Sequence, residues 1–197
     1  MTQIDINILI VWGAVARKFK KGEMIFWEDE VAHFYHQIQS GTVRVYNIND
    51  EGREFTQGIF SDGNSFGEPP LFSQDTYAAS AIAMTDAVIY KLNIEGFQRL
   101  LKEYPEVQHG FNVLFAKRLY DKACMAREII NSPESRILAF LKKTKHAATK
   151  EEGLFRIPYT RQEIANSTGL RVETVIRTLK RMVKENKVEV KGHKLFY

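Results

Sequence analysis

Residues 160–181, TRQEIANSTGLRVETVIRTLKR, decide the fold of the C-terminal part of the chain. Thr160 and Glu163 have the spacing of a capping box, in which each side chain accepts a hydrogen bond from the backbone amide of the other residue. A short helix therefore begins there. It ends at Gly169, which can adopt the positive φ of a tight turn. A second helix follows over residues 171 to about 185, so the stretch predicts a helix-turn-helix.

The second helix has an apolar face made by Val175, Leu179 and Met182. Glu173 and Arg177 share a different face because they lie four residues apart. The first turns of such a helix enter the major groove of DNA. There Arg can donate twice to guanine and Glu can accept from the amino group of cytosine. We interpret the pair as recognising a G·C base pair; a surface ion pair is the alternative.

A β-hairpin, the wing, is expected after this helix. Residues 188–190 and 195–197 form its strands, and the turn between them contains Gly192. Lys191 and Lys194 lie at the tip of the wing, where we expect them to contact DNA phosphates.

The distribution of charge agrees with a nucleic-acid partner. Residues 149–197 hold 11 Lys and Arg against 6 Asp and Glu, while residues 1–148 hold 17 against 18. A compact basic segment joined to a neutral body indicates a polyanionic partner, because neutralising phosphates supplies most of the sequence-independent affinity for DNA. Taken alone, the charge could also belong to a solvated face.

The composition indicates a globular protein: 44% of the 197 residues are hydrophobic and 26% are charged. The longest apolar run near the start, residues 6–12, is too short to cross a bilayer. No membrane segment is expected, and we predict a cytoplasmic protein. The single cysteine, Cys124, excludes an intramolecular disulfide or a four-cysteine metal site and fits a reducing compartment.

The N-terminal part is predicted to be a small antiparallel barrel or roll. From Phe19 to about Leu92, short candidate strands alternate with turn signals at roughly ten-residue spacing. The signals are Lys20-Lys21-Gly22, Ser40-Gly41, Asn49-Asp50-Glu51-Gly52 and Ser61-Asp62-Gly63-Asn64. We expect no helix inside this region.

Helices are predicted after the roll. Asn93 is a candidate N-cap for a short helix to about Lys102, and a long helix follows the break at 104–105 and runs to about Ile130. Ser132-Pro133 opens a further helix to about His146. Residues 149–153 form a polar connector.

The long helix has apolar residues on more than one face. They are Val107, Phe111, Leu114, Phe115, Leu119, Met125, Ile129 and Ile130. A helix with two apolar faces needs two partners. We predict that these are its own β-domain and the same helix of a second subunit; burial within one domain is the alternative.

Over nearly its whole length the chain resembles the CRP/FNR family of cyclic-nucleotide-receptor-like regulators. The stretches that carry the resemblance are residues 35–43 (YHQIQSGTV), Phe66-Gly67-Glu68 with Leu71-Phe72, the long helix, TRQEIA at 160–165 and VETVIR at 172–177. The resemblance implies an α+β protein with an N-terminal double-stranded, jelly-roll-like β-roll. It also implies a homodimer that binds a palindromic operator and acts on RNA polymerase.

We divide the chain accordingly into three parts. They are a cyclic-nucleotide-binding-like sensor roll (1–104), a dimerisation helix (105–131) and a winged helix-turn-helix domain that binds double-stranded DNA (132–197). The resemblance assigns base recognition to Glu173, Arg177, Val172 and Ile176. With the charge pattern, it assigns phosphate contacts to Thr160, Arg161, Arg171, Thr174, Lys180, Lys191 and Lys194. Ile176 is bulkier than the Gly or Ser usual in the family, so the resemblance does not predict the identity of the outer bases of the half-site.

The possible effector pocket departs from the nucleotide-binding members. Its residues are Gly67, Glu68, Tyr77, Ala78, Lys122 and Ala123. In those members an Arg and a Ser or Thr hold the cyclic phosphate, and here Tyr77 and Ala78 stand in their places. We expect the pocket to lack its only nearby countercharge for a buried phosphate. Pro69 and Pro70 also remove two backbone donors, and Lys122-Ala123 replaces the Thr-Ser pair that contacts adenine. Cyclic AMP is therefore not the expected effector.

Other sensory chemistries find no positive support. Iron–sulfur members need several cysteines. His33, His36 and His109 are candidate haem ligands without a supporting pattern, and Cys124 is either a redox sensor or a small buried hydrophobe. No cofactor or metal is expected, and any small-molecule effector stays unidentified.

An enzyme is not expected, because the sequence holds no nucleophile elbow, phosphate-binding loop or zinc-protease motif. The alternatives are a cyclic-nucleotide-responsive receptor module that acts on DNA or on a partner protein, and a constitutive regulator whose roll is a scaffold.

Overall fold

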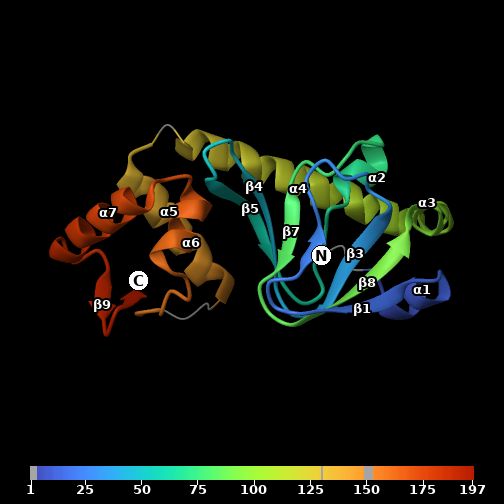
Figure 1. The fold of residues 1–197 in the computed structure, drawn as a ribbon, viewed down its shortest axis with the longest axis horizontal. Helices are drawn as coiled ribbons and strands as arrows, with labels where there is room; N and C mark the ends of the chain where they lie inside the picture. The colour runs from blue at the N-terminus through green and yellow to red at the C-terminus, as the bar shows by residue number, and fades with distance from the viewer. Residues whose placement is uncertain (1–3, 130, 149–152) are drawn as a thin grey trace. The chain divides into compact units, whose positions relative to one another are not determined.

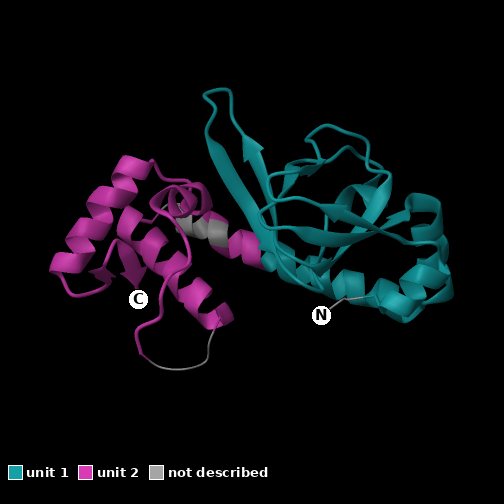
Figure 2. Cartoon of the chain, turned by 60° about the horizontal axis from the view of Figure 1, so that its bottom comes forward, with its two compact units in different colours: residues 1–120 teal, residues 121–197 magenta. Residues whose placement is uncertain are grey.

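The computed structural model describes residues 4–129, 131–148 and 153–197, without the side chains of 125 and 127–129. The chain divides into two compact units, Met1–Tyr120 and Asp121–Tyr197 (Figure 2). The boundary falls inside helix α4 (Pro105–Ile129), and each unit is described by itself.

Two four-stranded antiparallel sheets form the β-roll of the first unit (Figure 1), which confirms the predicted fold. The strands are β1 (Val15–Phe19), β2 (Met24–Phe26), β3 (Phe34–Ser40), β4 (Val43–Ile48), β5 (Glu54–Phe60), β6 (Ser65–Phe66), β7 (Ser80–Ala83) and β8 (Ala87–Asn93). One sheet has the order β1-β8-β3-β6 and the other β2-β7-β4-β5. All four predicted turns contain a glycine with positive φ. At Gly41 a Cβ would lie 2.6 Å from the Cβ of Ala87, so only glycine allows this approach.

A short helix, α2 (Pro69–Ser73), interrupts the β-region, so the expectation of no helix there is wrong. Pro69 and Pro70 lie at its first positions, where the fixed φ and the missing N–H of proline are tolerated. Leu71 anchors the helix in the core. Five residues are too few to show a helical period in the sequence, which is why the pattern did not predict the helix.

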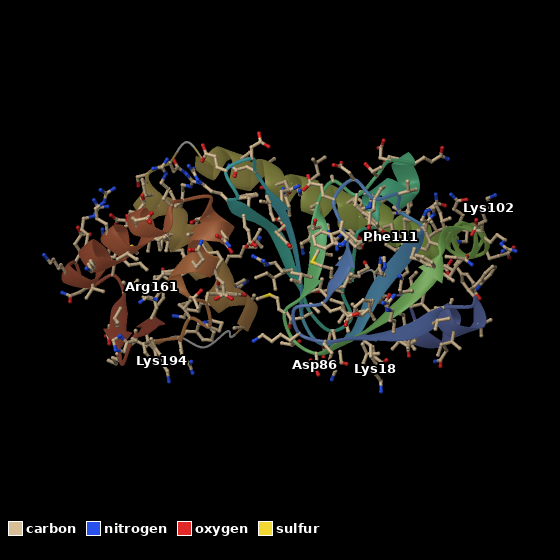
Figure 3. All side chains as sticks on the ribbon, viewed as in Figure 1. Lys18, Asp86, Lys102, Phe111, Arg161 and Lys194 are labelled. Carbon is tan, nitrogen blue, oxygen red and sulfur yellow. The ribbon has the colours of Figure 1, made fainter. Side chains whose placement is uncertain are left out.

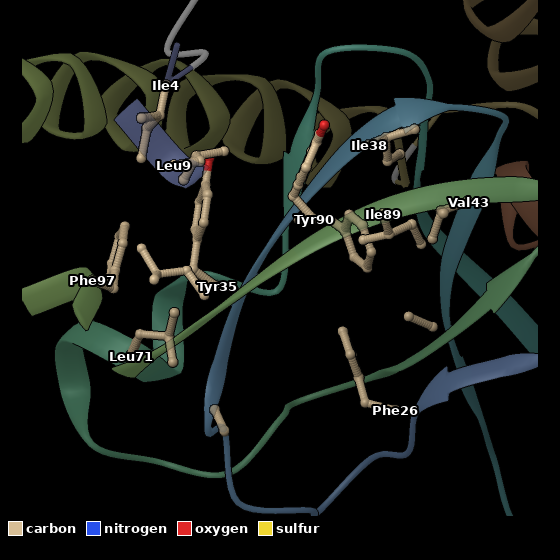
Figure 4. Packing of buried hydrophobic residues seen from close by; sticks show 14 of the residues in the cluster. Ile4, Leu9, Phe26, Tyr35, Ile38, Val43, Leu71, Ile89, Tyr90 and Phe97 are labelled. Atoms are coloured by element: carbon tan, nitrogen blue, oxygen red, sulfur yellow. The ribbon is translucent and has the colours of Figure 1, made fainter. Parts of the chain in front are cut away.

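The core of the first unit is rich in aromatic rings (Figure 4). Tyr35 of β3 stacks on Phe97 of α3 (Ile94–Glu103) with ring centroids 4.7 Å apart. Phe111 of α4 meets Tyr35 edge-on at 5.9 Å. Helix α1 (Ile6–Val11) contributes the buried Leu9. The predicted N-cap of α3 is confirmed, since the Asn93 side chain accepts from the amide of Gly96.

Helix α4 packs on this core through one face and turns another to solvent. The core face holds Val107, Phe111, Leu114 and Phe115, which confirms the first of the two predicted partners. Val113, Ala116 and Tyr120 lie on the opposite face at helical spacing and are exposed. Leu119 is exposed at its flank. The side chains of Met125, Ile129 and Ile130 fall outside the described part of the chain.

The second unit consists of helices and a hairpin. Its elements are α5 (Pro133–Ala148), α6 (Arg161–Thr168), α7 (Val172–Lys184), β9 (Glu189–Lys191) and β10 (Lys194–Phe196). Ser132 caps α5 as predicted, because its Oγ accepts from the amide of Ser135. Residues 155–157 extend the hairpin through hydrogen bonds to Leu195 and Tyr197. Of the predicted connector, residues 149–152 lie outside the description. No helix in the described ranges combines the length and the hydropathy that crossing a membrane requires.

Candidate nucleic-acid interface and sensor pocket

The capping box that begins α6 is formed as the sequence predicts. Thr160 Oγ1 accepts from the amide of Glu163 at 3.2 Å, and the amide of Thr160 donates to Glu163 Oε2 at 2.6 Å. Gly169 caps the other end of α6 with a φ of 63°. Because the Thr160 hydroxyl acts as an acceptor in the box, its hydrogen can still be donated to a phosphate oxygen.

The recognition helix α7 is placed by its apolar face. Val175, Leu179 and Met182 are buried in the core of the second unit, together with residues of α5 and α6. Side chains at three- and four-residue spacing form an exposed row on another face, which we call the recognition stripe. Its members are Glu173, Ile176, Arg177, Lys180 and Lys184. The fold thus presents one polar, mainly cationic row of α7 to solvent.

Glu173 and Arg177 do not pair with each other. In the described part of the chain, the ion pairs of α7 are made by Arg181, which contacts Glu134 and Glu185. The surface ion pair considered as an alternative for Glu173 and Arg177 is therefore not formed, and both side chains are exposed.

The far end of α7 is tied to the start of α5. Arg181 Nη2 lies 2.7 Å from Glu134 Oε2, and Lys187 Nζ lies 2.5 Å from Glu134 Oε1. Hydrogen bonds from Lys187 and Arg181 lower the pKa of Glu134. The guanidinium of Arg136, also on α5, donates to the carbonyl of Thr168 at the end of α6. These contacts position the helix-turn-helix, so Arg181 and Lys187 are used within the protein.

A groove of about 480 Å³ lies between the wing and the start of α6. It brings together three predicted phosphate contacts, Thr160, Arg161 and Lys194, of which Figure 3 labels the last two. Arg156 and His193 line the same groove and were not predicted. The sequence gives no sign that these two residues share a groove, because the groove forms only when residues 155–157 pair with β10.

The remaining predicted DNA contacts are distributed as follows. Arg171 is the exposed N-cap of α7, and Thr174 is half-buried one turn later. Lys191 is exposed on the wing and pairs with Glu189 at 2.6 Å. Val172 is partly buried against the core of the second unit, so its role in base recognition stays a prediction.

In the roll, aromatic rings pack directly against the Gly-Glu motif. A Cβ on Gly67 would lie 2.9 Å from the ring of Phe26. Tyr77 stacks on Phe26 with centroids 3.7 Å apart and planes 8° apart, and its hydroxyl donates to the carbonyl of Phe34 at 3.4 Å. Burial raises the pKa of Tyr77. Ala78 is exposed, and its carbonyl accepts from Asn47.

Glu68 is fully buried and bound to an arginine that the sequence did not reveal. Arg118 of α4 donates from Nη1 to Glu68 Oε2 at 2.9 Å and from Nη2 to the carbonyl of Ser65 at 2.8 Å. Its guanidinium also lies 5.2 Å from the centroid of the Phe60 ring. The expectation that a bound phosphate would lack a countercharge stays a prediction, because this guanidinium is paired with Glu68 and with the Ser65 carbonyl. A helix 50 residues further along the chain supplies the guanidinium.

His36 is the buried member of the three histidines considered as haem ligands. Its ring packs between Phe26 and Phe66, with centroids 5.5 and 5.4 Å away. Burial lowers its pKa to about 3, and Lys91 adds to this effect. Neither ring nitrogen has a hydrogen-bond partner among the described residues. His33 and His109 are exposed.

The other candidate sensor residues lie on α4 beyond Tyr120, in the second unit. Lys122 and Ala123 are exposed, and Cys124 is half-buried. Their roles in an effector site or in redox sensing stay predictions.

A β-roll followed by a long helix and a winged helix-turn-helix with an exposed recognition stripe defines a DNA-binding transcriptional regulator. Residues 16–104 match the cyclic nucleotide-binding domain, and residues 135–196 match the Crp-like helix-turn-helix domain. The two matches follow each other in the order that the resemblance predicts. The chain belongs to the CRP/FNR family.

The chain is also similar to individual proteins in sequence and to a solved structure in fold. The chain is 28% identical over 177 residues to the cyclic AMP receptor protein of Thermus thermophilus, covering 88% of this chain and 79% of that protein. It is 26% identical over 183 residues to electron transport regulator A of Shewanella oneidensis, covering 89% and 72%. Its fold matches that of the c-di-GMP-responsive regulator CLP of Xanthomonas campestris. The TM-score is 0.84 at 22% identity, over 97% of this chain and 98% of that one.

Proposed function

We propose that this regulator binds a two-fold-symmetric operator as a homodimer and recognises one G·C pair in each half-site through Glu173 and Arg177. The observation that supports this most directly is the exposure of both side chains without a mutual ion pair, on the first turns of α7. A guanidinium held there can donate to guanine O6 and N7, and a carboxylate can accept from cytosine N4. Two recognition helices of a dimer would contact successive major grooves, about 34 Å apart.

The solvent face of α4 supports the homodimer. Val113, Ala116 and Tyr120 form an apolar row opposite the face that packs on the roll. The small Ala116 allows a second helix to approach closely, and the larger neighbours supply apolar area to bury. The family acts with RNA polymerase, and we extend this partner and a cytoplasmic location to the present chain. The proposal assigns it no catalysed reaction.

We infer that cyclic AMP is not the effector. By resemblance, the cyclic phosphate would lie next to positions 77 and 78, where the Tyr77 ring instead stacks on Phe26. Arg118 does provide a guanidinium, but Glu68 and the Ser65 carbonyl already accept its hydrogen bonds. A phosphate in this place would have to displace packed rings and compete with a buried carboxylate. Any effector would act by rotating the winged domains about residues 131–133.

The test is a selection of bound sequences from a random duplex pool, using the full-length protein at a stated salt concentration with and without cyclic AMP. Enrichment of a palindrome with a fixed G·C pair in each half-site, equal in both pools, would support the whole proposal. Enrichment only with cyclic AMP would refute the effector inference and favour the nucleotide-responsive alternative. Failure to enrich any sequence in either pool would count against operator binding by the isolated protein.

A further inference from the structure

One side chain of the recognition stripe differs from its neighbours in chemistry. Ile176 is 40% exposed, while Val175 beside it is fully buried. The other aliphatic residues near the ends of α7, Val172 and Val183, are partly buried against the core. Within the described α7, Ile176 is therefore the large apolar side chain that the helix turns to solvent.

Its position places it among the side chains proposed to contact DNA. Ile176 lies three residues after Glu173, directly before Arg177 and four residues before Lys180, so all four share one side of the helix. A β-branched side chain on a helix is restricted to essentially one χ1 rotamer. The isoleucine is thus a rigid apolar surface inside a row of charges.

Most groups on the base edges in the major groove are hydrogen-bond donors or acceptors. The apolar exception is the C5-methyl group of thymine. An isoleucine placed against an amino or carbonyl group would remove its water without offering a hydrogen bond, which is unfavourable. Against a methyl group the same contact buries apolar surface on both partners and is favourable.

We propose that Ile176 recognises the 5-methyl group of a thymine in each half-site, next to the G·C pair assigned to Arg177. The inference rests on the proposed function, because it requires α7 to lie in the major groove. It specifies what that function leaves open, the chemical identity of the neighbouring base. The recognised feature is the methyl group itself, so 5-methylcytosine at the same position should be bound better than cytosine.

The experiment uses the palindrome obtained from the selection. Each thymine of the half-site is replaced in turn by deoxyuridine, which removes the methyl group and leaves the hydrogen-bonding edge unchanged. Binding is measured by fluorescence anisotropy at fixed salt. We expect one position at which the wild-type protein loses on the order of fourfold in affinity per half-site, the effect of about one buried methyl group. The variant Ile176→Ala should lose this discrimination and still bind the operator.

Leu154→Ala is the matched control, because Leu154 is an exposed aliphatic residue of the second unit outside α7 and outside the groove, with 54% of its surface accessible. This variant should keep the deoxyuridine effect. If no thymine position is sensitive, or if Ile176→Ala retains the sensitivity, the inference is wrong while specific binding shows that the proposed function stands. If the wild-type protein discriminates no duplex at all, the proposed function and this inference fail together.

Discussion

The ion pair between Arg118 and Glu68 is expected to hold α4 on the roll, and replacing Arg118 by Met tests this. Glu68 is fully buried, and 28% of the Arg118 side chain is exposed. Removing one partner of a buried pair typically costs 3–5 kcal/mol, because the other charge stays buried without compensation. Because water reaches part of Arg118, we expect a loss at the lower end of this range, about 3 kcal/mol.

The converse change, Glu68→Gln, should cost less, about 1.5 kcal/mol, because the partly exposed guanidinium can turn to water. The double variant should cost about 2.5 kcal/mol, so the two changes are coupled by about 2 kcal/mol. The cost in the double variant reflects lost packing and the lost hydrogen bond to the Ser65 carbonyl.

Urea unfolding of the full-length protein, followed by tryptophan fluorescence, measures these values. Both tryptophans of the chain, Trp12 and Trp27, lie in the first unit, so the signal reports the unfolding of the roll. Lys20→Met serves as a control, because Lys20 pairs with Asp86 on the surface and its loss should leave the midpoint unchanged. A loss below about 1 kcal/mol for Arg118→Met, or strictly additive effects, would refute a stabilising role of the pair.

Three other residues test the exposed face of α7, the dimer contact of α4 and the pH dependence of the roll. Arg177→Ala should weaken operator binding by about 1–3 kcal/mol and relax the preference at one G·C pair. Lys191→Ala should weaken binding to all sequences alike. Fluorescence anisotropy measures both effects, and equal losses on every sequence for both variants would rule out base recognition by Arg177. Tyr120→Glu should shift the protein toward the monomer in analytical ultracentrifugation, because a charge would enter the apolar face of α4, and an unchanged mass would place the dimer contact elsewhere. Burial lowers the pKa of His36 from 6.5 to about 3, so below pH 6.5 the unfolded chain binds a proton at this ring while the folded chain does not. The folded state therefore loses stability as the pH falls, by about 2 kcal/mol at pH 5. His36→Phe should therefore flatten the stability of the roll between pH 7 and 5, and an unchanged slope in urea titrations would show that other groups cause it.

Much of the secondary structure follows from short stretches of sequence. Thr160 and Glu163 form the predicted capping box, Gly169 makes the predicted turn, and Asn93 and Ser132 cap the predicted helices. These features depend on hydrogen bonds between residues at most a few positions apart, so spacing alone identifies them. The roll could also be predicted from local signals, because glycine-containing turns recur at regular intervals in its sequence. In the structure the glycines of these turns have positive φ.

The candidate site depended more on the tertiary structure. The exposed face of α7 could be predicted, because the 3.6-residue period separates Glu173 and Arg177 from the buried Val175 and Leu179. The groove between the wing and α6 could not, since it requires Arg156 and His193 to be brought together by strand pairing.

The sequence by itself determined the class of protein, through its helix-turn-helix motif and family resemblance. It also determined the order of the parts and the exposed face of the recognition helix, because these depend on local periodicity and capping. Only the tertiary structure decided the state of the sensor roll. It brings Arg118 to Glu68 across 50 positions and stacks Tyr77 on Phe26 across 51, and no local pattern encodes either contact. Such contacts form when the sheets close and α4 packs on them. Burial removes water from the charged groups and the rings, and a buried charge without a partner is costly.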